Sequence, residues 1–71
     1  MDRQFNAIQK QLGRKVNAAR KALGLSQEKL ALEADVDRTY VSQIERGICN
    51  PSLLALHKIS KVLKIPIVDL L

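Results

Sequence analysis

Apolar residues recur every three or four positions through the first third of the chain. They are Phe5, Ile8, Leu12, Val16, Ala19 and Leu23. This spacing places them on one face of an α-helix, so the pattern predicts a long amphipathic helix from Asp2 to about Ala22. Gly24 is expected to close it. Gly13 lies inside this helix at a cost of roughly 1 kcal/mol relative to alanine, which allows the first ten residues to fray.

A shorter helix is predicted to begin at Gln27. Ser26 precedes it, and serine is a favoured N-cap residue whose hydroxyl accepts a hydrogen bond from a first-turn amide. The inner face of this helix is formed by Leu30, Ala31 and Ala34. The helix is expected to end at Asp35, because aspartate tolerates a left-handed backbone.

A third helix is predicted from Arg38, with Asp37 as its N-cap and Gly47 as the left-handed residue that ends it. Val41 and Ile44 lie on its inner face. Its outer face carries the polar residues Arg38, Thr39, Ser42, Gln43 and Arg46. Two short helices across a three-residue turn have the geometry of a helix-turn-helix, whose second helix enters the major groove of DNA.

The remaining chain predicts a fourth helix over residues 53–63 and a last short helix from Ile67 to Leu70, after Pro66. The fourth helix has two chemically sensible starts, Asn50 followed by Pro51, or Ser52 as N-cap. Its inner face is expected to consist of Leu53, Leu56, Ile59, Ser60 and Leu63. Lys64 is expected to end it with a left-handed backbone.

Two stretches, LSQEKLA and DRTYVSQIERGICNPS, resemble the lambda-repressor-like, Xre-type DNA-binding family. The form DRTYVS, IERG, NPS is most similar to the controller proteins of restriction-modification systems. This resemblance favours Ser52, of the two possible starts, as the N-cap of the fourth helix. The resemblance extends from about Leu12 to Leu71 and implies an all-α, compact five-helix lambda-repressor-like domain over residues 1–71, with the helix-turn-helix at its second and third helices. Residues before Leu12 are then a helical extension, an arm that touches DNA, or a frayed end.

Charge favours the same class of partner. The net charge is +5, but residues 27–47 hold five acids and three bases, so the positive charge lies in the flanking segments. Attraction to DNA is therefore expected from these flanks, while the two-helix segment supplies placed contacts. No apolar run approaches the roughly 18 residues needed to span a bilayer, and no signal peptide is visible. With a single cysteine and hence no internal disulfide, we expect a cytoplasmic protein.

Base reading is assigned to the outer face of the third helix. The guanidinium of Arg38 can make two hydrogen bonds to guanine, and the amide of Gln43 can do the same with adenine. Thr39 offers a methyl or a hydroxyl group, and Ser42 a hydroxyl group, to base or backbone. For Arg38 and Gln43 the alternative is a solvated surface position.

Contacts to phosphates or to DNA shape are assigned to Gln27, Tyr40, Arg46, Asn50 and Ser52. The resemblance implies the phosphate role of Gln27. For Tyr40, packing within the domain is an equally good interpretation. The resemblance also implies a structural ion pair between Arg20 and Glu45, whereas without it Arg20 would be read as a solvated charge.

Catalytic and metal-binding chemistry have no support in the pattern. His57 has no second ligand or catalytic partner, and Cys49 is expected to be an unreactive thiol at a position where similar proteins often carry a basic residue. Phosphate-binding glycine loops, paired carboxylates and nucleophile elbows do not occur. We therefore expect neither an enzyme nor a cofactor, a metal or a small-molecule substrate.

The function that fits best is a dimeric, sequence-specific transcription regulator that binds an inverted-repeat operator. An alternative is an antitoxin-type interaction module, although such proteins usually carry a further toxin-binding segment; a membrane-surface binder fits the turn chemistry poorly. Spare apolar residues near the C-terminus suggest a homodimer interface at Ile67, Leu70 and Leu71. The other possibility is that these residues pack inward.

Overall fold

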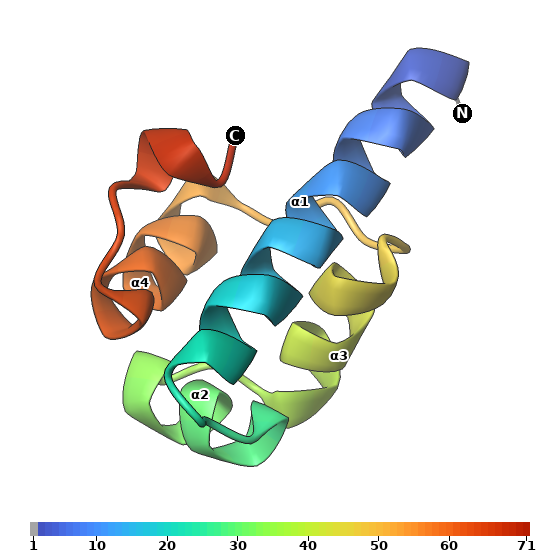
Figure 1. The fold of residues 1–71 in the computed structure, drawn as a ribbon. Coiled ribbons are helices and arrows are strands. Elements are labelled where there is room, and N and C mark those ends of the chain that lie inside the picture. Colours follow the sequence, from blue (N-terminus) through green and yellow to red (C-terminus); the bar gives the residue numbers. More distant parts are fainter. Residues whose placement is uncertain (1) are drawn as a thin grey trace.

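The computed structural model describes residues 2–71, which form four α-helices and one turn of 3₁₀ helix (Figure 1). The elements are α1 (Arg3–Ala22), α2 (Gln27–Ala34), α3 (Arg38–Arg46), α4 (Leu53–Leu63) and η1 (Ile67–Asp69). The expected all-α architecture is confirmed. None of the described helices is long and apolar enough to cross a membrane.

The expected fifth helix is wrong in type. Residues Ile67–Asp69 make a single 3₁₀ turn, with i→i+3 hydrogen bonds of 2.9 Å from Asp69 N to the Pro66 carbonyl and from Leu70 N to the Ile67 carbonyl. The tighter turn brings Leu70 back over α4, where its side chain becomes part of the core. The chain therefore forms a 3₁₀ turn here, not an α-helix, and this turn buries the Leu70 side chain.

Helix boundaries follow local capping chemistry, as predicted. The Ser26 hydroxyl accepts a hydrogen bond from Lys29 N at 3.0 Å, and the Asp37 carboxylate accepts one from Thr39 N at 3.0 Å. Ser52, the favoured of the two candidates, caps α4 by accepting from Ala55 N at 3.1 Å. The helices end in left-handed residues at the predicted positions, including the two that are not glycine, Asp35 (φ 57°) and Lys64 (φ 62°).

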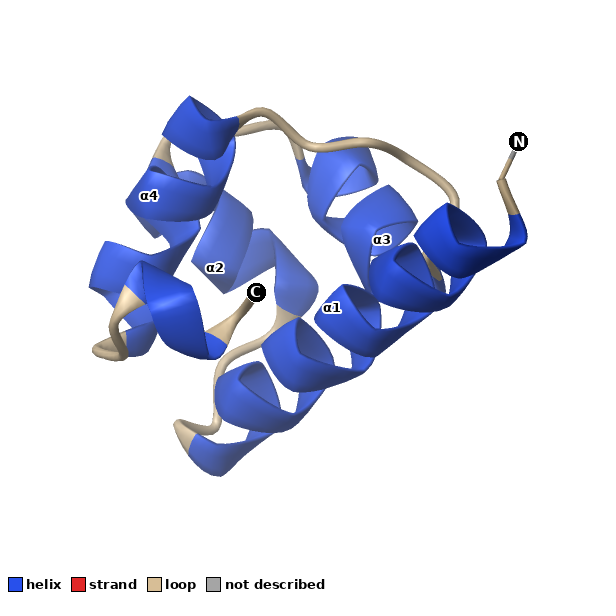
Figure 2. Ribbon diagram, turned by 90° about the horizontal axis from the view of Figure 1, so that it is seen from above, coloured by secondary structure: helices blue, strands red, loops and turns tan. Residues whose placement is uncertain are grey.

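Helix α1 spans the molecule along one side, and its N-terminal turns project beyond the other helices (Figure 2). Helix α1 packs against α3, and α2 lies between α3 and α4. The core between them is formed by Leu12, Val16, Leu30, Ala31, Ala34, Val41, Ile44, Leu56, Ile59, Leu63 and Leu70. The predicted inner faces of α2 and α3 are therefore confirmed.

Three residues predicted to face inward are exposed instead: Ile8, Leu23 and Leu53. On α1 the buried line runs through Gln9, Leu12, Gly13, Val16 and Arg20, about one position round from the apolar stripe. Two polar residues on this line bond to groups outside α1: Gln9 donates to the Cys49 carbonyl, and Arg20 donates to Glu45 of α3. Leu53 lies in the first turn of α4, next to solvent.

Gly13 explains how closely α1 and α3 approach. A Cβ atom at Gly13 would lie 2.5 Å from the Ile44 carbonyl oxygen and 2.6 Å from that of Glu45. Just beyond the last turn of α3, a Cβ atom on Gly47 would lie 2.9 Å from the Cα atom of Lys10. The two backbones are therefore in contact at both points, so any larger residue at Gly13 would displace α3.

Candidate nucleic-acid interface

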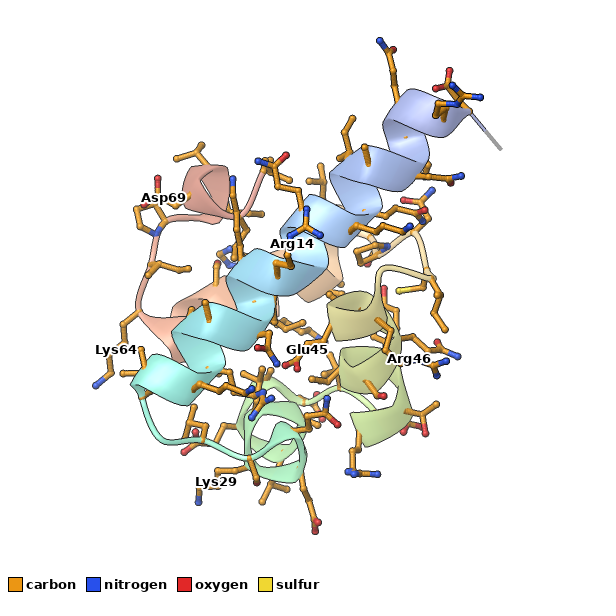
Figure 3. The ribbon with its side chains drawn as sticks, turned by 45° about the vertical axis from the view of Figure 1, so that its right-hand side comes forward. Arg14, Lys29, Glu45, Arg46, Lys64 and Asp69 are labelled. Carbon is orange, nitrogen blue, oxygen red and sulfur yellow. The ribbon has the colours of Figure 1, made fainter. Side chains whose placement is uncertain are left out.

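Helix α3 presents a polar face outward. Arg38, Thr39 and Arg46 are exposed, and Ser42 and Gln43 are partly exposed. Val41 and Ile44 on the opposite side are buried in the core. The structure thus brings the four residues assigned to base reading together on one accessible stripe of the helix. Figure 3 shows Arg46 at the end of α3 directed away from the body of the protein.

The inner side of α3 is held to α1 by an ion pair. Arg20 Nε donates to Glu45 Oε2 at 2.6 Å, and Arg20 Nη2 donates to Glu45 Oε1 at 3.0 Å. The third guanidinium nitrogen, Nη1, donates to the Leu25 carbonyl at 2.7 Å. Only 10% of the Arg20 side chain and 4% of the Glu45 side chain are exposed. The pair implied by the resemblance is therefore present, and it is bidentate and largely dry.

Two further side chains donate to the same carboxylate. Asn17 Nδ2 lies 2.8 Å and Gln27 Nε2 lies 3.1 Å from Glu45 Oε1. Glu45 of α3 is thus bonded to residues of both α1 and α2, and we call these four residues, Glu45 with Arg20, Asn17 and Gln27, the Glu45 hub. Sequence reasoning missed Asn17, although it lies three residues before Arg20, on the same face of α1.

The hydrogen bonds of the hub shift the pKa values of its two charged members, Glu45 and Arg20, in favour of their charged forms. Burial raises the pKa of the Glu45 carboxyl, but hydrogen bonds from Arg20, Asn17 and Gln27, with the Arg20 charge, outweigh burial and hold that pKa below its usual range. The hydrogen bond to Glu45 likewise raises the pKa of Arg20. Both groups are therefore charged at neutral pH.

Acid should remove the stabilisation that Glu45 provides. Because the pKa of Glu45 is lower in the folded state, its contribution is present above the ordinary value of about 4.3 and is lost as pH falls through the folded-state pKa. Urea unfolding of the wild type and of Glu45→Gln from pH 7 to pH 3 tests this. The difference in unfolding free energy between the two proteins should shrink below about pH 4.3. Parallel curves would show that Glu45 has no depressed pKa.

Candidate phosphate contacts surround the start of α4. The Tyr40 hydroxyl accepts a hydrogen bond from Ser52 N at 3.1 Å, and the half-buried ring packs against the core. The Ser52 hydroxyl accepts from Ala55 N. A hydroxyl that accepts one bond still has its proton to donate, so both groups can serve a phosphate as well. Asn50 is exposed beside them, whereas Gln27 is half-buried and uses one amide proton within the Glu45 hub.

The assignment of Leu70 to a dimer interface is wrong. Its side chain is 1% exposed and lies in the core of its own protomer. Ile67 is partly buried against the core, while Leu71 is 60% exposed and Val68 is also exposed. The turn of η1 sends these neighbours in different directions, so only Leu71 and part of Ile67 remain available from the predicted set.

Gln9 and Cys49 are joined by a hydrogen bond between α1 and the segment that follows α3. Gln9, which sequence reasoning missed, is 7% exposed and donates through Nε2 to the Cys49 carbonyl at 2.7 Å. Gln9 lies seven residues, or two helical turns, before Val16 and therefore on the same face of α1. The sequence pattern alone could have predicted its burial. The half-buried Cys49 thiol has a pKa raised by burial, which keeps it protonated and unreactive at neutral pH.

Comparisons with known proteins agree with this geometry. The family model described as "Helix-turn-helix" matches residues 16–70. The chain is 49% identical over 67 residues to control protein C.BamHI of Bacillus amyloliquefaciens, which covers 93% of this chain and 83% of that protein.

Solved structures agree as well. The restriction-modification controller protein C.AhdI from Aeromonas hydrophila superposes with a TM-score of 0.88 at 38% identity, covering 92% of this chain and 98% of that one. The master regulator for biofilm formation SinR, a Bacillus subtilis protein solved in complex with DNA, gives a TM-score of 0.81 at 38% identity, covering 83% and 95%.

Proposed function

The chain belongs to the helix-turn-helix family, and from this premise we propose that it is a cytoplasmic, sequence-specific DNA-binding regulator of transcription of the restriction-modification controller type. The observation that carries the proposal is the two-sided character of α3. Its inner side is fixed by the Glu45 hub, while its outer side is polar and accessible. Similarity to C.BamHI and C.AhdI over nearly the whole chain supports the controller class.

In the proposed complex the outer face of α3 lies in the major groove. Arg38 in its first turn pairs with guanine O6 and N7, and Gln43 one turn further on pairs with adenine N7 and N6. Thr39 and Ser42 lie between them on the same stripe and contact bases or the adjoining backbone. The angle of entry is set before binding, because the Glu45 hub holds α3 against α1 and α2.

Phosphate contacts flank this groove in the proposal. Arg46 supplies a charge at the end of α3, and Asn50, Ser52 and Tyr40 supply polar groups near the start of α4. Gln27 at the first turn of α2 supplies its remaining amide proton. Since the net charge of +5 lies largely in the flanking segments, affinity should fall steeply as salt rises.

The operator is expected to be an inverted repeat read by a homodimer. One recognition helix contacts only a few base pairs, so specific regulators usually place two copies across a two-fold axis with recognition helices about 34 Å apart. The exposed Leu71, with the accessible part of Ile67, is the proposed contact between copies. Val68 is a further exposed apolar residue of η1.

Selection of bound duplexes from a random DNA pool tests the function and supplies the operator. With the selected duplex, Arg38→Ala and Gln43→Ala should each cost about 1–3 kcal/mol at one base position and leave binding to unrelated DNA nearly unchanged. Arg14→Ala is the matched control, because it removes an exposed arginine from α1 rather than α3. Equal losses on every sequence would contradict base reading, and failure to enrich any sequence would contradict the function.

A further inference from the structure

Residues 3–11 of α1 lie before residue 16, where the match to the helix-turn-helix family model begins. They project past the helix-turn-helix (Figure 1) but still contact the rest of the domain. Their inner side lines a groove together with the segment that leads from α3 to α4. The groove is lined by Phe5, Ile8, Gln9, Leu12, Asn50, Pro51 and Leu53, among others. The extension therefore lies against the loop that follows the recognition helix.

Gln9 fixes one end of that loop. Its side chain is almost fully buried, and its amide donates to the Cys49 carbonyl at 2.7 Å, forty residues away along the chain. The backbone at Lys10 covers Gly47 so closely that a Cβ atom there would lie 2.9 Å from Lys10 Cα. A polar bond and a close backbone contact thus hold the first half of the loop on α1.

Tyr40 fixes the other end. Its hydroxyl accepts a hydrogen bond from Ser52 N, at the residue that caps α4. Asn50 lies between these two attachments, one residue after Cys49 and two before Ser52, and its side chain is exposed. A loop held on both sides presents an exposed residue in one place, and a group placed before binding loses less entropy when it meets its ligand.

We propose that Gln9 is a positioning residue for the DNA-backbone contact of Asn50, so that this part of α1 braces the loop that follows α3. In this proposal, the hydrogen bond from Gln9 to the Cys49 carbonyl holds the loop so that the side-chain amide of Asn50 meets a phosphate of the bound duplex. This inference rests on the proposed DNA-binding function. It adds the residue that holds Asn50 in position for its contact with the DNA backbone.

A double-mutant cycle with the selected duplex tests it. Gln9→Met keeps the length of the side chain but removes its donor, and it should weaken binding about fivefold, the equivalent of one ordinary hydrogen bond. Gln11→Met, the same change at an exposed position of α1, is the control and should bind as the wild type. In an Asn50→Ala background Gln9→Met should have no further effect, whereas in an Arg38→Ala background its full effect should remain.

The outcomes separate the two levels of the proposal. Failure of the wild type to bind any duplex refutes the function, not the positioning role alone. Given binding, the role of Gln9 is overturned if Gln9→Met binds like the wild type, if Asn50→Ala binds like the wild type, or if Gln9→Met costs the same in both backgrounds. A loss of stability alone cannot mimic the expected result, because it would act equally in the two backgrounds. Unfolding in urea confirms that each variant is folded under the binding conditions.

Discussion

Arg20→Ala should lower the free energy of unfolding by about 3–5 kcal/mol, because it leaves the Glu45 carboxylate buried without its counter-ion. A domain of 71 residues has a total stability of only about 4–11 kcal/mol. The expected loss is therefore a large fraction of the total stability. Urea denaturation followed by circular dichroism measures the loss, and Arg14→Ala, an exposed arginine on the same helix, should change stability by less than about 0.5 kcal/mol.

A double variant separates the missing charge partner from lost packing. Arg20→Met together with Glu45→Leu removes both charges and keeps apolar volume, so it should recover a large part of the stability that Arg20→Ala loses. Asn17 and Gln27 are only partly buried and can bond to water once the carboxylate is gone. If the double variant is as unstable as Arg20→Ala, the bare carboxylate is not the cause.

Leu70→Ser should be similarly damaging, with a loss of about 3–5 kcal/mol of unfolding free energy. The leucine side chain fills the core below η1, so serine leaves a cavity and buries a hydroxyl group. Leu71→Ser is its matched control, since the adjacent side chain is 60% exposed and should change stability by at most about 0.5 kcal/mol. Equal stability of the two variants would contradict the orientation of η1.

The same pair tests the proposed dimer. Leu71→Ser should remain folded but sediment as a monomer at low micromolar protein, because it removes an exposed apolar contact between copies. Binding to the selected duplex should weaken accordingly. A Leu71→Ser protein that still sediments as a dimer would place the interface elsewhere, without affecting the assignment of Leu70 to the core.

Features set by neighbouring residues were predictable from the sequence. Ser26, Asp37 and Ser52 cap their helices because a short polar side chain reaches the amides of the next turn in any context. Asp35 adopts a left-handed backbone for an equally local reason. These signals were sufficient to locate both helices of the helix-turn-helix to the residue.

Features set by contacts distant in sequence were not predictable in this way. Gly13 looked like a weak point of α1, but its missing side chain is what admits α3. Gln9 is buried while the more apolar Ile8 is exposed. The Gln9 side chain donates a hydrogen bond to the Cys49 carbonyl, which is forty residues away in the sequence. Leu70 was predicted to be an exposed interface residue, but the 3₁₀ turn of η1 directs its side chain into the core. In each case the deciding partner comes from another element.

The two sides of α3 differ in their contacts, and this difference has an evolutionary consequence. Glu45 and its donors fix the pose of the helix from within, whereas Arg38, Thr39, Ser42 and Gln43 lie on the side that faces solvent. Duplicated copies of such a gene can therefore diverge in the outer four positions without passing through unstable intermediates. If these four positions read the bases as proposed, each copy would acquire a new target while keeping the same scaffold, so related regulators could avoid cross-talk within one cell.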